Sequence, residues 1–307
     1  MSVSAQPRLR APDDEPGDET GTDLSRLKVV PSRHPWRWVG VVVVLVLVAM
    51  FVNGLVTNPG WDWPTFFKFF TAESILRAVV ITLELTLYGT VIGFALGVVL
   101  AIMRLSRSTF LIGVSWTYIW AFRSIPLIVQ LLFWFNISYL YQELHFGIPF
   151  GPTFFGVDTK DLISPMGAAV LGLALHQAAY AAEIVRSGII AVDHGQLEAA
   201  SALGIPKVHQ FRRIILPQAM RSILPNAANE VISLFKGTSV VSVVAIGELF
   251  YQVQVIYGRN ARVVALLMVA TVWYIALTTV LSVIQHYVEK RYAKGATRDK
   301  AGWKWER

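Results

Sequence analysis

The stretch that decides the fold class covers residues 79–103 and reads VVITLELTLYGTVIGFALGVVLAIM. A helix needs about 20 apolar residues to cross the hydrocarbon core of a bilayer, and this stretch is long enough. Glu84 is its one charged side chain. The stretch therefore predicts a transmembrane helix.

Long apolar blocks recur through the rest of the chain. Of the 307 residues, 54% are hydrophobic and 15% are charged, whereas soluble domains average about 45–50% and 25%. We predict five further spans, at roughly Trp38–Val56, Leu111–Tyr141, Met166–Ile184, Leu224–Val253 and Val264–Val288. The expected fold is an all-α polytopic membrane protein with about six transmembrane helices.

The two ends of the chain are polar. Residues 1–35 are rich in Pro, Asp, Glu, Gly and Ser, which predicts a disordered tail. The first span lacks a small-residue cleavage pattern, which favours a retained anchor over a signal peptide. We divide the chain into the tail 1–35, an added anchor and outer loop 36–74, a membrane domain 75–288 and a basic tail 289–307.

Basic residues indicate the orientation. They precede the first span, follow the second at Arg104 and Arg107, fill the segment between the fourth and fifth, and dominate the C-terminal tail. Because Lys and Arg concentrate in cytoplasmic loops, we expect both termini and residues 193–219 in the cytoplasm. Arg259 and Arg262 are mild exceptions. The net charge of +7 thus fits an anionic membrane surface better than nucleic acid.

Metal and thiol chemistry are not expected. The chain has no cysteine, and its six histidines are scattered without a close ligand pair. No nucleophile–base motif or H-E-x-x-H sequence appears, so an intramembrane enzyme is a weak alternative.

Small residues and a proline predict features inside the spans. Gly89, Gly93 and Gly97 form a stripe that permits close approach by another helix. The third span is too long for one straight crossing and contains Pro126, where we expect a kink or break.

Polar residues at membrane depth need an explanation, because a charge at the bilayer centre costs about 2.5–3.5 kcal/mol on insertion scales. Glu84 should face protein or water, as a substrate contact or a structural partner. Lys236 begins a polar interruption with Thr238 and Ser239 that either faces a cavity or pairs structurally. For Arg123 the simplest interpretation is that its side chain extends toward the cytoplasmic headgroups.

One helix face near the end of the fourth span carries Glu183 and Arg186. Their spacing of three predicts an ion pair on that face.

Residues 193–219 predict a compact helix–turn–helix. Asp193 can cap a short helix, with Gln196 as the reciprocal member of a weak capping box. Gly204 suits the helix C-terminus, and Pro206 suits the first position of the next helix. Without further information, an amphipathic helix on lipid headgroups is the alternative.

This segment resembles the EAA motif of ATP-binding-cassette (ABC) importer permeases. The matching positions are Gly195, Glu198, Ala199, Ala200, Gly204, Ile214, Leu216 and Pro217. In that family the motif docks on the ATPase, so the resemblance implies that this segment is a cytoplasmic coupling helix.

Three other segments resemble the polar amino-acid branch of this family, which imports histidine, glutamate, glutamine, arginine or opines through a five-helix MetI-like core. They are R-S-I-P-L-I-V-Q-L from Arg123, with Pro126 and Gln130; A-Y-A-A-E-I-V-R-S-G-I, with Tyr180, Glu183 and Arg186; and K-G-T-S-V from Lys236. Gly237 and Val240 depart from the family pattern. The resemblance covers roughly residues 75–288.

The resemblance implies a transport subunit for polar amino acids rather than an enzyme. Two permease subunits, identical or different, would sit on an ATPase dimer that binds ATP and Mg²⁺, and an extracytoplasmic binding protein would deliver the solute. This chain has no G-x-x-x-x-G-K-[ST] phosphate loop. The candidate substrate path comprises Glu84, Gln130, Lys236, Thr238 and Ser239. Arg123, Pro126, Tyr180, Glu183 and Arg186 are expected to act in structure or gating.

Two transport alternatives stay open. The chain could be an ABC permease for a peptide, sugar or metal, although the segments 123–131 and 179–189 argue against this. A proton-coupled secondary transporter would need an ionisable relay and usually internal repeats, and neither is evident.

Overall fold

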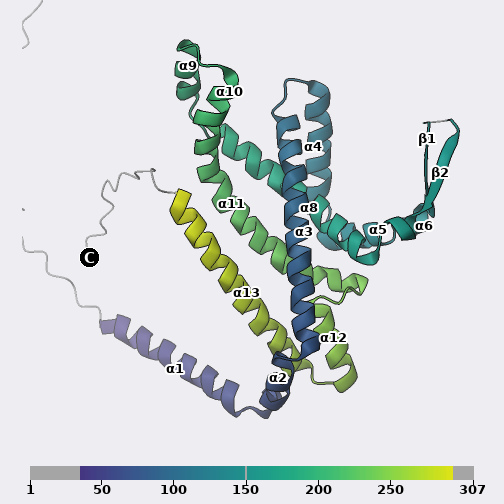
Figure 1. Ribbon diagram of the computed structural model, residues 1–307. Coiled ribbons are helices and arrows are strands. Elements are labelled where there is room, and N and C mark those ends of the chain that lie inside the picture. The colour runs from purple at the N-terminus through teal and green to yellow at the C-terminus, as the bar shows by residue number, and fades with distance from the viewer. Residues whose placement is uncertain (1–34, 149–150, 293–307) are drawn as a thin grey trace, which may run out of the picture. The chain divides into compact units, whose positions relative to one another are not determined.

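The computed structural model describes residues 35–148 and 151–292, almost all of them in helices (Figure 1). The long helices are α1 (Pro35–Thr57), α3 (Glu73–Arg104), α8 (Pro165–Ile190), α11 (Leu216–Gly237) and α13 (Val263–Tyr292). The shorter helices are η2 (Pro59–Trp61), α2 (Trp63–Phe70), α4 (Thr109–Ser124), α5 (Leu127–Phe135), α6 (Ile137–Leu140), α7 (Thr159–Leu162), α9 (His194–Ala202), α10 (Lys207–Gln210), the π-helix η3 (Phe211–Ile215), the 3₁₀-helix η4 (Thr238–Val244) and α12 (Leu249–Asn260).

The number of membrane crossings agrees with the prediction of about six. Among the described residues, α1, α3, α8 and α13 are each long and apolar enough to cross a membrane. Two bent pairs bring the number up to six. They are α4 with α5, bent by 104°, and the run Lys207–Val244 with α12, bent by 45°.

The compact unit begins at Leu55, so α1 up to Gly54 is described by itself. Helix α2 belongs to the compact unit. Phe66 of α2 is buried together with Ile75, Leu249 and Val269, which come from α3, α12 and α13. The boundaries at residues 75 and 288 stay predictions.

Helices α3 and α8 make the most extensive helix–helix contact of the compact unit. A Cβ atom on Gly93 would lie 2.6 Å from the Gln177 Cβ, and one on Gly97 would lie 2.5 Å from the Ala181 Cβ. Real Cβ atoms do not approach so closely, so these positions require glycine. The predicted glycine stripe is confirmed as the contact surface between two helices.

Two predicted spans are not single helices. The break at Pro126 is confirmed, because α4 ends at Ser124 and Pro126 is the N-cap of α5. The predicted span Leu224–Val253 is a bent run rather than one continuous helix. α11 ends at Gly237, a 3₁₀ segment follows, and Ala245 turns the chain with φ 59° before α12.

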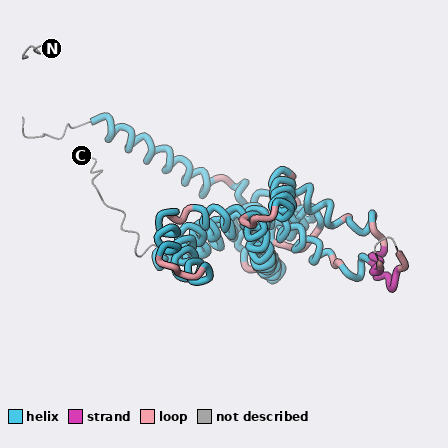
Figure 2. Tube along the Cα trace, turned by 90° about the horizontal axis from the view of Figure 1, so that it is seen from above, coloured by secondary structure: helices cyan, strands magenta, loops and turns pink. Residues whose placement is uncertain are grey.

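A β-hairpin is the one departure from an all-helical fold among the described residues (Figure 2). Strands β1 (Glu143–Gly147) and β2 (Thr153–Asp158) pair antiparallel, with Phe146 opposite Phe155 and their rings stacked at 5.0 Å. These residues lie between the predicted spans Leu111–Tyr141 and Met166–Ile184, where no secondary structure was predicted.

Candidate functional site

The predicted coupling segment forms two short helices, α9 and α10, at the end of the unit where α3 terminates (Figure 1). Asp193 caps α9, as predicted, by accepting a hydrogen bond of 2.7 Å from the Gly195 amide. The prediction that Gln196 makes the reciprocal capping bond is wrong. The Gln196 Oε1 atom instead accepts from Gln218 Nε2 at 2.6 Å, which ties α9 to α11.

The turn after α9 depends on Gly204, whose φ is +68°. The Gly204 amide donates to the Ser201 carbonyl at 3.0 Å, and the Ile205 amide donates to the Ala200 carbonyl at 3.1 Å. This pair of bonds is a Schellman motif, which satisfies the last carbonyls of a helix and favours glycine at the left-handed position. Pro206 is the N-cap of α10 rather than its first residue. The helix therefore begins at Lys207, one residue later than predicted.

Gln210 holds the turn from the inside. Its side chain is buried, and its Nε2 atom donates to the Ile205 carbonyl at 2.8 Å and to the Ser201 hydroxyl at 3.2 Å. Gln210 was not among the residues predicted from the sequence. Its position four residues after Pro206 on a short helix was the available signal.

The EAA positions divide between core and surface. Ala200 is buried, whereas Gly195, Glu198 and Ala199 are exposed. Ile214 is half-buried, and Leu216 and Pro217 are exposed.

Large apolar side chains in and beside α9 and α10 are exposed. Leu203 is 78% exposed, Val208 66% and Phe211 43%. An exposed apolar surface of this kind marks a contact with another protein or with lipid.

The segment continues without interruption into the membrane helix. α10 leads through the π-helix Phe211–Ile215 into α11. Pro217, in the first turn of α11, has no amide hydrogen to donate. π-turns are frequent at functional sites. A displacement of α9 and α10 therefore has a continuous helical connection to Gly237.

The five candidate path residues fall into two groups. Gln130 and Thr238 are buried within the chain, and the Thr238 hydroxyl donates to the Phe235 carbonyl at 2.6 Å. Glu84 and Lys236 are exposed, and Ser239 is half-buried. The exposed pair is available to solute or to another subunit, and the assignment of all five to the path stays a prediction.

Gln130 stabilises the break between α4 and α5. Its Nε2 atom donates to the carbonyls of Phe122 and Ile125 at 2.7 and 2.8 Å, and it lies 3.2 Å from His176 Nδ1. Pro126 frees carbonyls at the end of α4, and an amide side chain satisfies them at membrane depth, as buried backbone requires.

The predicted structural or gating residues come together on α4 and α8. The Arg123 guanidinium lies 5.3 Å from the Tyr180 ring centroid, a cation–π contact. The predicted ion pair is confirmed, since Arg186 Nη2 lies 2.8 Å from Glu183 Oε2. The sequence spacing therefore identified a real cluster, whose gating role stays a prediction.

Glu248 is a buried carboxylate that the sequence analysis missed. It is 0% exposed and caps α12 by accepting from the amides of Phe250 and Tyr251 at 2.9 and 2.6 Å. The Tyr274 hydroxyl of α13 donates to it at 3.2 Å. Glu248 thereby fixes the turn that follows the polar segment 236–239. A carboxylate inside a predicted span was the signal.

An ion pair joins α2 to the turn before α13. Asp62 Oδ2 lies 3.1 Å from Arg262 Nη1. A hydrogen bond with Thr65, supported by the nearby Arg262 charge, holds the pKa of Asp62 below its ordinary value. This contact explains one of the two basic residues that the charge rule left as exceptions.

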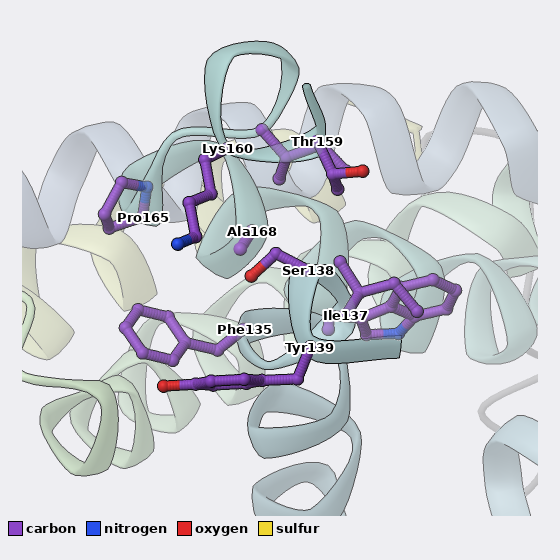
Figure 3. Close-up of a pocket in the computed structure, with 10 residues that line it drawn as sticks. Phe135, Ile137, Ser138, Tyr139, Thr159, Lys160, Pro165 and Ala168 are labelled. Carbon is purple, nitrogen blue, oxygen red and sulfur yellow. The ribbon is translucent and has the colours of Figure 1, made fainter. Parts of the chain in front are cut away.

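A cavity of about 280 Å³ lies between α5–α6 and the start of α8 (Figure 3). Lys160 and Ser138 turn their polar ends toward the same space, beside Phe135 and Tyr139 (Figure 3). The lining combines aromatic walls with one ammonium group. No sequence motif marked it.

No group of three or more histidine, aspartate or glutamate side chains able to hold a metal ion occurs in the described ranges.

Comparisons with known proteins agree with this geometry. Residues 93–294 match the family model "Binding-protein-dependent transport system inner membrane component". The arginine transport system permease protein ArgU of Corynebacterium glutamicum is 41% identical over 89% of this chain and 85% of that protein. The octopine transport system permease protein OccM of Rhizobium radiobacter is 34% identical over 73% of this chain and 86% of that protein.

A solved structure supports the same assignment. The crystal structure of an amino acid ABC transporter with histidines matches with a TM-score of 0.61 at 32% identity, covering 71% of this chain and 94% of that chain. The MetNI methionine ABC transporter shares the fold, with a TM-score of 0.56 at 21% identity. The chain therefore belongs to the family of binding-protein-dependent transport system inner-membrane components, the permeases of ABC importers.

Proposed function

We propose that this chain is the membrane-spanning permease subunit of an ATP-driven importer of polar amino acids. The observation that carries the proposal is the folded EAA segment. Its Schellman turn at Gly204 presents Glu198 and an exposed apolar surface to a partner. Relatives that are named for arginine and octopine make a basic amino acid the first solute to test.

In this proposal the chain does no chemistry of its own. A pair of permeases, identical or different, rests on two ATPase subunits that bind ATP and Mg²⁺, and an extracytoplasmic binding protein delivers the solute. Both termini and the α9–α10 segment lie on the cytoplasmic side of a bacterial cell membrane, as the distribution of Lys and Arg favours.

Coupling follows from the continuity of α10, η3 and α11. Closure of the ATPase dimer would move α9 and α10, and the helix would carry that movement to the polar segment at Lys236. Such a two-state element is biased by nucleotide because ATP binds better to one state than to the other.

Glu84 and Lys236 are the path residues best placed to meet solute, since both are exposed in this chain. A carboxylate and an ammonium group complement the two charges that every amino acid carries.

Reconstitution in proteoliposomes tests the proposal. The permease would be combined with its ATPase and its binding protein, and uptake of labelled arginine, glutamate, glutamine, a sugar and a dipeptide would be compared. We expect uptake of a polar amino acid that requires ATP and the binding protein. An ATPase variant lacking its phosphate-loop lysine is the matched control.

Two results would contradict the proposal. Uptake driven by a proton gradient without ATP would indicate a secondary transporter. ATP-dependent uptake of only the sugar or the dipeptide would retain the importer class and reject the amino-acid assignment.

A further inference from the structure

A second cavity, of about 450 Å³, lies between α3, α4 and α8. Its lining is basic and aromatic, and it includes Arg104, Arg123, Arg186, Glu183, Trp116 and Trp120. We call it the arginine cavity. It is separate from the cavity in Figure 3 and from the coupling segment.

The arginine cavity carries more positive than negative charge. Glu183 is already paired with Arg186, through contacts of 2.8 and 3.1 Å. Glu230 of α11 interacts electrostatically with Arg123 from outside the lining. Three guanidinium groups against these two carboxylates leave one positive charge in excess.

Arg104 is the group whose charge lacks a partner. Its Nε atom is buried and has no hydrogen-bond partner in the described chain. Arg123 lies over the Tyr180 ring and makes no ion pair within 4 Å among the residues that the structure describes. Arg104 as a whole is half-buried, and an anion beside it would give the buried Nε donor the partner that it lacks.

The rim of the cavity is suited to lipid. Trp116 and Trp120 stack with their rings 6.1 Å apart and nearly parallel, and they are 50% and 58% exposed. On the same helix Phe110 is 75% exposed. Tryptophan concentrates where headgroups meet acyl chains, because its ring is apolar and its N–H is polar.

The position of the cavity selects the inner leaflet. Arg104 ends α3 at the same end of the unit as α9 and α10 (Figure 1). The charge distribution assigns that end to the cytoplasm, where anionic lipids attract basic residues and basic pockets between helices bind their headgroups.

We propose that the arginine cavity binds the phosphate headgroup of an anionic phospholipid from the cytoplasmic leaflet. The phosphate lies between Arg104 and Arg123, and the acyl chains run along Trp116 and Trp120. This site rests on the proposed orientation and is independent of which solute is carried.

Lipid binding to the assembled transporter tests the proposal. The complex would be placed in phosphatidylcholine nanodiscs with graded amounts of spin-labelled phosphatidylglycerol, and the immobilised fraction would be measured. We expect Arg104→Gln to weaken phosphatidylglycerol binding at least about fivefold, since a basic residue near the surface contributes about 1 kcal/mol. Arg104→Lys should keep most of the binding.

Arg107→Gln is the matched control. Arg107 is exposed, lies just beyond the end of α3 and is absent from the cavity lining. Its loss removes only the general attraction of a basic residue to an anionic surface, so it should weaken binding clearly less than Arg104→Gln does. A photoreactive phosphatidylglycerol should label α4 near Trp116 in the unmodified complex, which keeps the test valid if Arg104→Gln fails to assemble.

Three outcomes would overturn the proposal. Equal losses in Arg104→Gln and Arg107→Gln would indicate general surface attraction. Binding of labelled inorganic phosphate without preference for phosphatidylglycerol would assign the site to a free anion. Absence of labelling near Trp116 in the assembled complex would show that phosphatidylglycerol does not occupy the cavity.

Discussion

Replacing Gly204 with alanine and, separately, with asparagine tests whether the backbone of the coupling turn matters. The left-handed φ of +68° costs a residue with a Cβ atom about 1–2 kcal/mol, and asparagine less. A Cβ at this position would meet nothing within 4 Å. A Cβ atom therefore fits sterically in both variants, so the comparison is directed at the backbone strain.

Hydrogen exchange measures that strain directly. The Ile205 amide is bonded to the Ala200 carbonyl at 3.1 Å and exchanges when the turn opens. A strain of about 1–2 kcal/mol makes opening about 5–30 times more frequent. We expect Gly204→Ala to accelerate exchange in this segment by that factor, and Gly204→Asn to stay within about threefold of the unmodified protein.

A functional readout follows from the same pair. If the turn presents the docking surface, Gly204→Ala should lower solute uptake per ATP hydrolysed, and Gly204→Asn should retain it. A role for backbone strain is refuted if the segment exchanges as slowly in Gly204→Ala as in the unmodified protein, or if Gly204→Asn is as damaging as Gly204→Ala.

Three other predictions concern packing, selectivity and pH. Gly97→Val should cost about 1–3 kcal/mol by overpacking the helix contact, seen as a lower thermal midpoint in detergent; Gly113→Val, which meets nothing within 4 Å, should not. Glu84→Gln should change the uptake ratio of basic to neutral amino acids at least about tenfold if the carboxylate faces solute, and an unaltered ratio at normal expression removes it from the path. The lowered pKa of Asp62 means that its stabilisation is complete above about pH 4 and is lost as the pH falls through the lowered value. The stability difference from Asp62→Asn should shrink on acidification, and a constant difference would contradict this.

Features with a local chemical cause were predictable from sequence. Pro126 must interrupt a helix, and Gly204 suits a left-handed helix end, so the break and the turn were both expected. The stripe at Gly89, Gly93 and Gly97 identified a contact surface but not its partner, because sequence periodicity does not say which helix approaches.

Features that depend on tertiary contacts were not predictable in the same way. Apolar composition alone does not distinguish one straight span from α11, η4 and α12 with a turn at Ala245. Gln196 had two possible partners, and the proximity of Gln218 decided between them. Glu248 was overlooked although the cost of a carboxylate at membrane depth applies to it as it does to Glu84.

The glycine and alanine surfaces of α3 and α8 also bear on how the protein is made. Helix α8 is the least apolar of the four long membrane-spanning helices, because the small residues that let it pack closely add little hydrophobicity. Gln177, which is buried against Gly93 of α3, lowers the hydropathy of α8 further. The insertion machinery should therefore hold α8 poorly as an isolated segment and well once α3 is already in the bilayer. Because α3 is synthesised first, the order of the chain supplies the partner that α8 needs during its own biogenesis.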